Sequence, residues 1–371
     1  MHIQPVTTKR ELAEFIAFPY WFYRDDPVWV PPLRSEQHGQ FDPGHNPLLD
    51  HCEWQLFLLM KGKSTIGRIA AFINTLAVDF WGAPIGLFGY YECIPDAQAA
   101  RLLLEAARGW LKSRGMTVMR GPWSFVSQEW GMVVEGFEPS PVIMAPYNPP
   151  YYNDQLSEFG LEKVKDLLCW YVSAAEGDRL PERITRLTDA VAKRYQVRTR
   201  MVDMKQYDQE VQTIVELSNS SIIDNWGYSP VTEAEVQAMA RDLRPVVQPE
   251  GVLFAEDASG RPIGFAIALP DINHLLKGLN GRLFPFGFIK LLWGIPRLHR
   301  YRMFALGVIP EYHGKAVDSL LYRAMNESLY APDIWLEINY VLEDNWPMIN
   351  AIKKMGARPL RRYRVYEMSI G

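Results

Sequence analysis

Residues 303–321, MFALGVIPEYHGKAVDSLL, constrain the fold of this chain more than any other stretch. Leu306 and Val308 alternate with small neighbours, as in a buried strand, and Pro310 ends that strand because proline cannot donate to a β-ladder. A helix is expected directly after the small-residue loop at 314–316. Because the first N–H groups of a helix have no partner and mark the positive end of its dipole, they suit an anion. The stretch therefore predicts a strand–turn–helix unit able to bind a phosphate.

The rest of the chain alternates strand and helix signals in an order that occurs twice. Thr8 and Thr232 each precede a glutamate three positions later, the spacing of a capping box, and so predict two helix starts. A length of 371 residues favours two domains over one. We therefore predict an internal duplication with a mixed α/β fold, in which residues 1–176 and 177–371 each form a central mixed sheet flanked by helices.

Composition limits the classes of function. A net charge of −4 argues against general nucleic-acid binding. The three cysteines are odd in number and widely spaced, which argues against a disulfide framework or a metal-ligand cluster and favours a reducing compartment. The N-terminus is too polar for a signal peptide, and no uncharged run reaches the roughly 20 apolar residues of a membrane span. We therefore expect a cytoplasmic protein with no metal, no nucleic-acid partner and no stable membrane span.

The second half, from Val197 onward, resembles the GNAT superfamily of acyl-CoA-dependent N-acyltransferases. The family's cofactor loop, Gln/Arg-x-x-Gly-x-Gly/Ala after a strand, falls on residues 311–316, where Gly314 and Ala316 match. Glu311 departs from the pattern, because it places an acid where the family has Gln or Arg. A backbone N–H site needs no particular side chain at that position. The resemblance implies that this loop binds the cofactor.

The resemblance also implies roles for individual residues. The N–H groups of residues 314–317 would hold the CoA pyrophosphate, and the backbone at 306–308 would hold the acyl carbonyl. A second family motif, Asn-x-x-Ala-x-x-x-Tyr-x-Lys-x-Gly, falls on residues 345–356, where Ile352 replaces the tyrosine that usually protonates the leaving thiolate. The implied co-substrate is acetyl-CoA or another acyl-CoA. The implied cofactor-binding residues are Leu306, Val308, Gly314, Lys315, Ala316, Val317 and Asn345.

A GNAT reaction needs an amine that has lost its proton, so a carboxylate or a water chain serves as base. Glu337 lies among apolar neighbours, two residues from Asn339 on the same face of an expected strand, and burial there would raise its pKa into a useful range. Glu337 could instead face solvent or pair with a nearby arginine. Tyr340 is a candidate acid in place of the missing tyrosine. We predict Glu337 and Tyr340 as the catalytic pair.

Aromatic residues in two loops are candidates for the acceptor site. Asn225, Trp226 and Tyr228 lie between two expected helices, in a loop that borders the acceptor pocket in this family, and aromatic rings there can enclose a substrate. They could equally hold the loop itself in place. The irregular stretch 121–138 offers a similar choice between an acceptor groove and packing. Its candidates are Trp123, Ser127 and Glu129.

Residues 271–302 form an apolar and basic insertion with no acid after Asp271. This composition fits an element that binds a membrane interface or covers a long acyl chain. It also fits an insertion that packs the two halves together and turns its cations to water. The sequence favours the packing interpretation.

The first half resembles the same fold more faintly. Its strand–helix junction at residues 92–100 lacks the glycine loop, and Asp96 would repel a phosphate. We expect this half to lack a cofactor site. The whole chain is expected to be an N-acyltransferase, most simply an N-acetyltransferase, that moves an acyl group from acyl-CoA to a small-molecule or peptide amine by direct attack. The alternative is a non-catalytic module that binds or senses acyl-CoA, which Glu311 and Ile352 favour.

Overall fold

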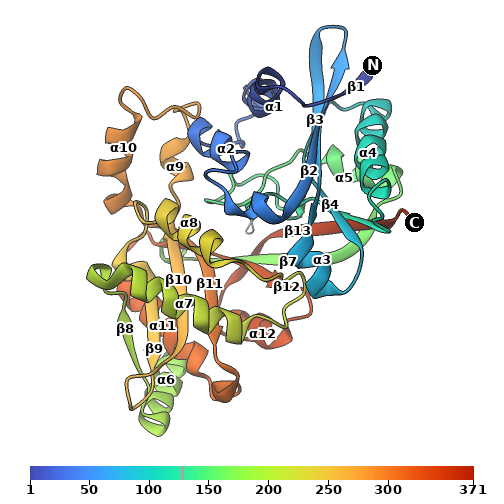
Figure 1. Ribbon diagram of the computed structural model, residues 1–371. Coiled ribbons are helices and arrows are strands. Elements are labelled where there is room, and N and C mark those ends of the chain that lie inside the picture. The colour runs from blue at the N-terminus through green and yellow to red at the C-terminus, as the bar shows by residue number, and fades with distance from the viewer. Residues whose placement is uncertain (127–128) are drawn as a thin grey trace.

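The fold is a large mixed sheet with helices on both of its faces (Figure 1). The computed structural model describes residues 1–126 and 129–371. Thirteen strands of these residues form the sheet, in the order β1-β2-β3-β4-β5-β13-β7-β12-β11-β10-β9-β8, with β6 beside β13. The strands are β1 (His2–Pro5), β2 (Cys52–Lys61), β3 (Ser64–Asn74), β4 (Ile85–Cys93), β5 (Val118–Gly121), β6 (Met132–Glu135), β7 (Glu162–Ser173), β8 (Arg198–Met201), β9 (Val252–Glu256), β10 (Pro262–Pro270), β11 (Arg300–Val308), β12 (Trp335–Leu342) and β13 (Arg358–Ser369).

The main helices begin where the sequence provides caps. Both predicted capping boxes form, after Thr8 and after Thr232. The Asp96 carboxylate accepts the Ala99 N–H at 2.9 Å and starts a third helix. The helices are α1 (Lys9–Phe22), α2 (Arg34–Gln40), α3 (Thr75–Trp81), α4 (Ala97–Lys112), α5 (Tyr151–Glu158), α6 (Glu182–Tyr195), α7 (Tyr207–Ser221), α8 (Glu233–Leu243), α9 (Asn273–Leu276), α10 (Gly287–Gly294), α11 (Val317–Ser328) and α12 (Trp346–Lys354). The predicted mixed α/β fold is confirmed.

The two halves of the chain exchange their last strands. β13, from the end of the chain, pairs with β5 of the first half, and β7 of the first half pairs with β12 of the second. β7 and β13 pair with each other, antiparallel, at the centre of the sheet. On each side of this central pair, the sheet contains a parallel pair of strands, which is β4–β5 in the first half and β11–β12 in the second. The sheet thus continues across the boundary expected at residues 176 and 177, and the division into two domains there stays a prediction.

The parallel strands β11 and β12 diverge toward their carboxyl ends. Their pairing ends at Met303 and Ile338, although the strands continue to Val308 and Leu342. Over this length β11 stays paired with β10 on its other side. The strands therefore form the two sides of a wedge.

The corresponding wedge in the first half is closed by backbone. Pairing of β4 with β5 ends at Leu87 and Arg120, and the Trp123 N–H then donates to the Phe88 carbonyl at 2.8 Å. Gly89 permits this approach, because a Cβ there would lie 1.6 Å from the Trp123 carbonyl oxygen. The first half therefore has no room for a ligand between these two strands.

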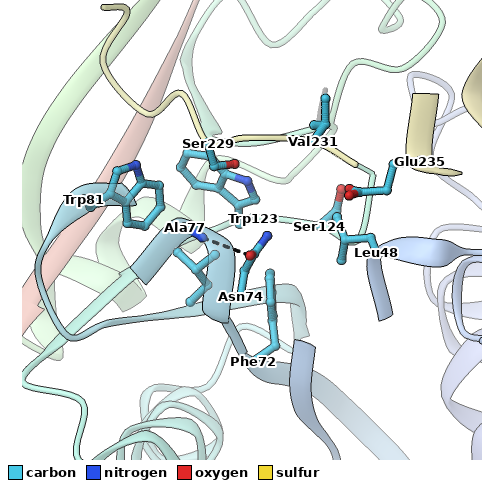
Figure 2. Close-up of a pocket in the computed structure, with 11 residues that line it drawn as sticks. Leu48, Phe72, Asn74, Ala77, Trp81, Trp123, Ser124, Ser229, Val231 and Glu235 are labelled. Carbon is cyan, nitrogen blue, oxygen red and sulfur yellow. Dashed lines mark hydrogen bonds between the residues drawn. The ribbon is translucent and has the colours of Figure 1, made fainter. Parts of the chain in front are cut away.

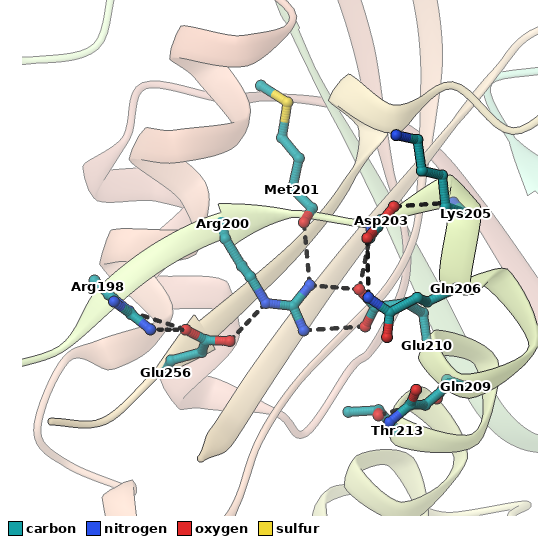
Figure 3. Close-up of polar contacts among 10 residues, drawn as sticks. All are labelled: Arg198, Arg200, Met201, Asp203, Lys205, Gln206, Gln209, Glu210, Thr213 and Glu256. Atoms are coloured by element: carbon teal, nitrogen blue, oxygen red, sulfur yellow. Dashed lines mark hydrogen bonds and ion pairs between the residues drawn. The ribbon is translucent and has the colours of Figure 1, made fainter. Parts of the chain in front are cut away.

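A buried ionic network fixes α7 against the outer edge of the sheet (Figure 3). Glu256 on β9 accepts hydrogen bonds from Arg198 at 2.9 Å and from Arg200 at 2.5 Å, both on β8. Arg200 also donates to both carboxylate oxygens of Glu210 on α7, at 2.6 and 3.0 Å. Both glutamates are buried. The two hydrogen bonds from Arg200 to Glu210 form a bidentate ion pair, which fixes the relative orientation of the two side chains. The network sets the position of α7 and of the loop that follows it.

Candidate functional site

The loop before α11 leaves the start of that helix uncapped. α11 follows Ala316, which adopts a left-handed backbone (φ 59°) and makes no side-chain cap. Gly314 is exposed, also has positive φ, and a Cβ on it would meet nothing within 4 Å. The first turn does contain Asp318, whose pKa is raised by burial, and the Ser319 N–H donates to the Ala316 carbonyl at 3.1 Å. The Lys315 N–H donates to the Tyr312 carbonyl at 3.3 Å, whereas the N–H groups of Gly314, Ala316 and Val317 lie at an open helix start, an arrangement that fits a pyrophosphate.

The charged residues of the loop are paired or placed over aromatic rings. Glu311, the departure from the family motif, forms an exposed ion pair with Arg261 at 2.8 Å. The Lys315 ammonium lies 4.5 Å from the centre of the Tyr312 ring. The His313 Nε2 lies 2.8 Å from the Val308 carbonyl oxygen. Because Arg261 neutralises Glu311, the acid is less adverse to an anion than the sequence alone indicates.

The remaining residues of the cofactor set line the wedge or support it. Leu306 and Val308 lie on β11 beyond its last pairing with β12, so the β12-facing side of this backbone has no strand neighbour. The Asn345 side chain accepts the Met348 N–H at 3.2 Å and caps α12. Ile352 is fully buried in the core behind the wedge. The cofactor-binding roles of these residues stay predictions.

A buried polar cluster lies at the root of the wedge. Glu337 on β12 is fully buried, and its Oε1 accepts a hydrogen bond from the Asn339 amide at 3.0 Å. Its Oε2 is buried and has no hydrogen-bond partner among the described residues. Burial raises the pKa of Glu337 to about 6, against the opposing charges of Arg361 and Arg302. The alternative in which Glu337 faces solvent is therefore wrong, and a carboxyl group able to exchange a proton near neutral pH is present.

Two buried arginines connect this cluster to the first half of the chain. Arg302 on β11 donates from Nε to the Asn339 side chain at 3.0 Å and from Nη1 to the carbonyls of Ile143, at 2.7 Å, and Met144. Arg361 on β13 donates to carbonyl oxygens of the same coil, which covers this face of the sheet. The coil from the first half therefore forms one wall around Glu337.

Tyr340 and Glu129 lie near the same charges. Burial raises the pKa of Tyr340 well above 10, and within residues 1–126 and 129–371 its buried hydroxyl has no hydrogen-bond partner. Burial, and to a lesser degree the charge of Glu36, raise the pKa of Glu129 to about 7, while Arg302 opposes the shift. Glu129 is thus a second candidate base. In the sequence it is one acid in an irregular stretch, and no spacing distinguishes it.

The α7–α8 loop reaches across to the first half. Trp226 stacks on Trp130, with ring centres 5.9 Å apart and planes 24° apart. The Tyr228 carbonyl accepts a hydrogen bond from the Trp81 indole at 2.7 Å, and Asn225 is exposed. Both aromatic residues therefore pack between the halves, and their roles toward a substrate stay predictions. Trp123 also stacks on Trp130, with ring centres 4.6 Å apart, whereas Ser127 lies outside the described residues.

A small cavity lies beneath this loop (Figure 2). The second half contributes Ser229, Val231 and Glu235, which face side chains of the first half across a volume of about 20 Å³. A space of this size holds a single water molecule. The first half contributes Leu48, Phe72, Asn74, Ala77, Trp81, Leu87, Trp123 and Ser124. The cavity is therefore part of the contact between the halves and is too small for an acyl acceptor.

The equivalent place in the first half is filled by the protein's own side chains. Asp96 caps α4, so its carboxylate occupies the helix start. From α5, the Tyr152 hydroxyl accepts the Cys93 N–H at 3.0 Å and the Gln155 amide donates to the Ile94 carbonyl at 2.9 Å. The Cys93 N–H and the Ile94 carbonyl, which a cofactor at this strand end would need, are thus already bonded to side chains of α5.

Within residues 1–126 and 129–371, no group of three His, Cys, Asp or Glu side chains is placed to hold a metal ion. No helix in the same residues is long and apolar enough to cross a membrane.

Comparison with protein-family profiles finds no match. The chain is 35% identical to the protein YghO of Escherichia coli (strain K12) over 376 residues, which cover 99% of this chain and 95% of that protein. It is 33% identical over 384 residues to the protein named bacterial ceramide synthase of Caulobacter vibrioides, covering 100% of this chain and 98% of that protein. Among solved structures, a tandem GNAT protein from the clavulanic acid biosynthesis pathway matches with a TM-score of 0.57 at 14% identity, covering 100% of this chain and 98% of that one.

The two relatives extend over nearly the whole chain, and the solved structure has the same tandem arrangement. The resemblance to GNAT proteins inferred from residues 311–316 and 345–356 is thereby confirmed for the chain as a whole. The chain belongs to the family that includes YghO of Escherichia coli and the protein named bacterial ceramide synthase of Caulobacter vibrioides, and it has the fold of tandem GNAT proteins.

Proposed function

We propose that this protein transfers an acyl group from an acyl-CoA to the amino group of a long-chain amino alcohol, forming an amide. A ceramide is such an amide, and a relative at 33% identity over the whole chain bears the name of a ceramide synthase. The observation that carries the proposal is the wedge between β11 and β12, with an uncapped helix start at its mouth and the buried Glu337 at its root.

The residues around the wedge support direct attack of the amine. The N–H groups of residues 314–317 would hold the pyrophosphate, and the unpaired edge of β11 would orient the thioester carbonyl. Glu337 or Glu129 would take the proton from the ammonium form of the acceptor, since both have pKa values raised toward neutrality. The neutral amine nitrogen then attacks the thioester carbonyl, the C–S bond breaks as the C–N bond forms, and the nitrogen loses its second proton while the leaving thiolate gains one. Tyr340 is the candidate proton donor to the leaving thiolate.

A second candidate function is acyl-CoA sensing without turnover. Ile352, where the family has its tyrosine acid, is fully buried in the core and cannot donate a proton. A binding module would keep the helix start and the wedge and would need no base. The two functions share cofactor binding and differ in turnover.

Calorimetry tests the shared step. We expect CoA to bind the wild-type protein and Gly314→Asp to abolish binding, because the added carboxylate faces the phosphates. Gly62→Asp is the matched control, since Gly62 also has positive φ and open space around it but lies in the β2–β3 turn. Equal CoA binding by both variants would contradict the assigned loop.

Thiol release then separates enzyme from sensor. Acyl-CoA is incubated with a long-chain amino alcohol in detergent micelles and, separately, with short water-soluble amines, and the amide is identified by mass spectrometry. Amide formation with the long-chain acceptor supports the proposal. CoA binding without release of thiol from acyl-CoA, whichever acceptor is present, supports the sensor.

A further inference from the structure

The segment between β10 and β11 carries the most exposed apolar surface of the described residues. Phe284 is 79% exposed and Trp293 72% exposed, values that a packed element would not show. We define the α10 patch as six side chains of α10 and the turn before it. The members are Phe284, Phe286, Phe288, Ile289, Leu292 and Trp293.

The base of this segment is firmly attached to the rest of the molecule. Asp271 accepts the Ile143 N–H and an Arg300 N–H, each at 2.9 Å. The Asn273 amide donates to the Pro141 carbonyl at 3.0 Å, and the backbone at Gly281 accepts from the start of α2 at 3.0 Å. The packing interpretation of residues 271–302 thus holds for the base and is wrong for α10. The fold holds α10 in place with its apolar side chains turned outward.

Cations surround the α10 patch without acidic partners. Lys277, Arg282, Lys290 and Arg297 belong to the same segment, and the sequence has no Asp or Glu between positions 272 and 310. In the part of the chain that the structure describes, none of these four side chains forms an ion pair with a carboxylate. The Arg297 guanidinium instead donates to the Trp293 carbonyl, and the Lys277 ammonium donates to the Ser140 hydroxyl at 3.1 Å. The surface therefore combines exposed aromatic rings with unneutralised positive charge.

We propose that the α10 patch inserts into the interfacial layer of an anionic lipid bilayer. Aromatic and aliphatic side chains at the tip and basic side chains beside them are the combination that amphipathic interfacial helices use. α10 has eight residues, which gives a length of about 12 Å, so it can lie in the interface and cannot span it. The basic residues complement the negative surface of phosphatidylglycerol-type or similar lipids.

The charges favour a lipid over a second copy of this chain. Two copies joined through the same patch would bring Lys290 and Arg297 close to their own counterparts, and like charges across an interface oppose pairing. An anionic bilayer neutralises all of these cations at once. The inference concerns the lipid surface and does not depend on the acyl-transfer proposal, although α10 lies on the same side of the molecule as α8 (Figure 1).

Co-sedimentation of the full-length protein with vesicles tests the inference. The probes are vesicles of phosphatidylcholine alone and of phosphatidylcholine with phosphatidylglycerol. We expect binding to the anionic vesicles, and Leu292→Glu with Trp293→Glu should weaken it by about tenfold or more, the contribution of one or two large apolar side chains. Lys290→Glu removes one positive charge and adds one negative charge, so it should weaken binding to anionic vesicles by about thirtyfold.

Matched controls use α6, which lies at the far end of the molecule from α10 (Figure 1). Leu187→Glu replaces a side chain that is 43% exposed there, and Arg186→Glu reverses an exposed charge beside it. Both controls should bind vesicles as the wild type does. CoA calorimetry on every variant reports whether the fold and the cofactor loop are intact, so loss of vesicle binding with intact CoA binding supports the α10 patch.

Three results would overturn the inference. The first is a wild-type protein that sediments with neither vesicle, and the second is an α10 double variant that binds as tightly as the wild type. The third is light scattering that shows a dimer which the Leu292→Glu, Trp293→Glu variant converts to a monomer, because the patch would then be a contact between copies.

Discussion

Replacing Glu337 with glutamine removes the only proton that this buried side chain can exchange. Burial raises the pKa of Glu337 from 4.5 to about 6 in the folded protein. The folded state therefore binds this proton more tightly than the unfolded state does. The bound proton stabilises the fold fully below pH 4.5, and this stabilisation is lost as the pH rises through about 6. The difference between the two pKa values corresponds to about 2 kcal/mol.

The Glu337→Gln substitution isolates the contribution that the Glu337 proton makes to the free energy of unfolding. Glutamine has the size of glutamate and keeps an oxygen to accept the Asn339 amide hydrogen bond, but it does not titrate. Urea unfolding at several pH values gives the free energy of unfolding for both proteins. We expect the wild type to lose about 2 kcal/mol relative to Glu337→Gln between pH 4.5 and pH 7. A difference that stays constant across this range would refute the assignment of a raised pKa.

The same variant decides whether Glu337 acts in turnover. If it is the base, kcat/KM for the acceptor rises through about pH 6 in the wild type, and Glu337→Gln abolishes the rise and lowers the rate by about a hundredfold or more. Glu129→Gln is the matched comparison, because the pKa of Glu129 is raised to about 7. A midpoint near 7 that disappears in Glu129→Gln would assign the role to Glu129. Undiminished turnover in Glu337→Gln would remove Glu337 from the mechanism.

Three further predictions concern packing and the acceptor site. Arg302→Met should lower the free energy of unfolding by about 3–5 kcal/mol, because it removes the buried hydrogen bonds of this guanidinium. Arg261→Met breaks only an exposed ion pair and should change the free energy of unfolding by about 0.5 kcal/mol or less. Urea unfolding measures both variants, and equal effects would contradict the role given to the Arg302 contacts. Tyr152→Phe should cost about 1–3 kcal/mol in the same assay, because the buried Cys93 N–H loses its acceptor, and an unchanged midpoint would argue against that bond. Trp226→Ala should raise the KM for a long-chain amine by about tenfold with little change in CoA affinity, and an unchanged KM would leave Trp226 as a packing residue.

Local signals in the sequence were sufficient for most of the secondary structure. Thr8 and Thr232 each accept the N–H that their cap position predicts, because a helix N-terminus needs only residues within one turn. The short helices α2 and α3 were missed. Each has seven residues, too few for a helical period to appear, and α2 has no side-chain cap.

The candidate site was predictable only where it depends on one continuous segment. Residues 314–317 form the expected loop because the turn and the helix start are consecutive in the chain. The environment of Glu337 was not predictable, since Arg302 is held by the carbonyl of Ile143, 159 residues away in the chain. Glu129, in the segment before β6, is also near enough to Arg302 for that charge to lower its pKa. The sequence patterns around Glu337 and around Glu129 cannot predict these contacts, because the contacts depend on the exchange of strands between the halves.

The strand exchange gives the first half a part in the site although its own wedge is closed. Its last strand, β7, lies beside β12, and the chain before β7 must therefore cross the face of the second half's sheet. That crossing chain supplies the carbonyl groups that bind Arg302 and Arg361. These two cations in turn oppose the effect of burial on Glu337 and keep the pKa of its carboxyl near 6, where it can act as a base at neutral pH. The first half thus influences the pKa of Glu337 through the backbone that the exchange places there.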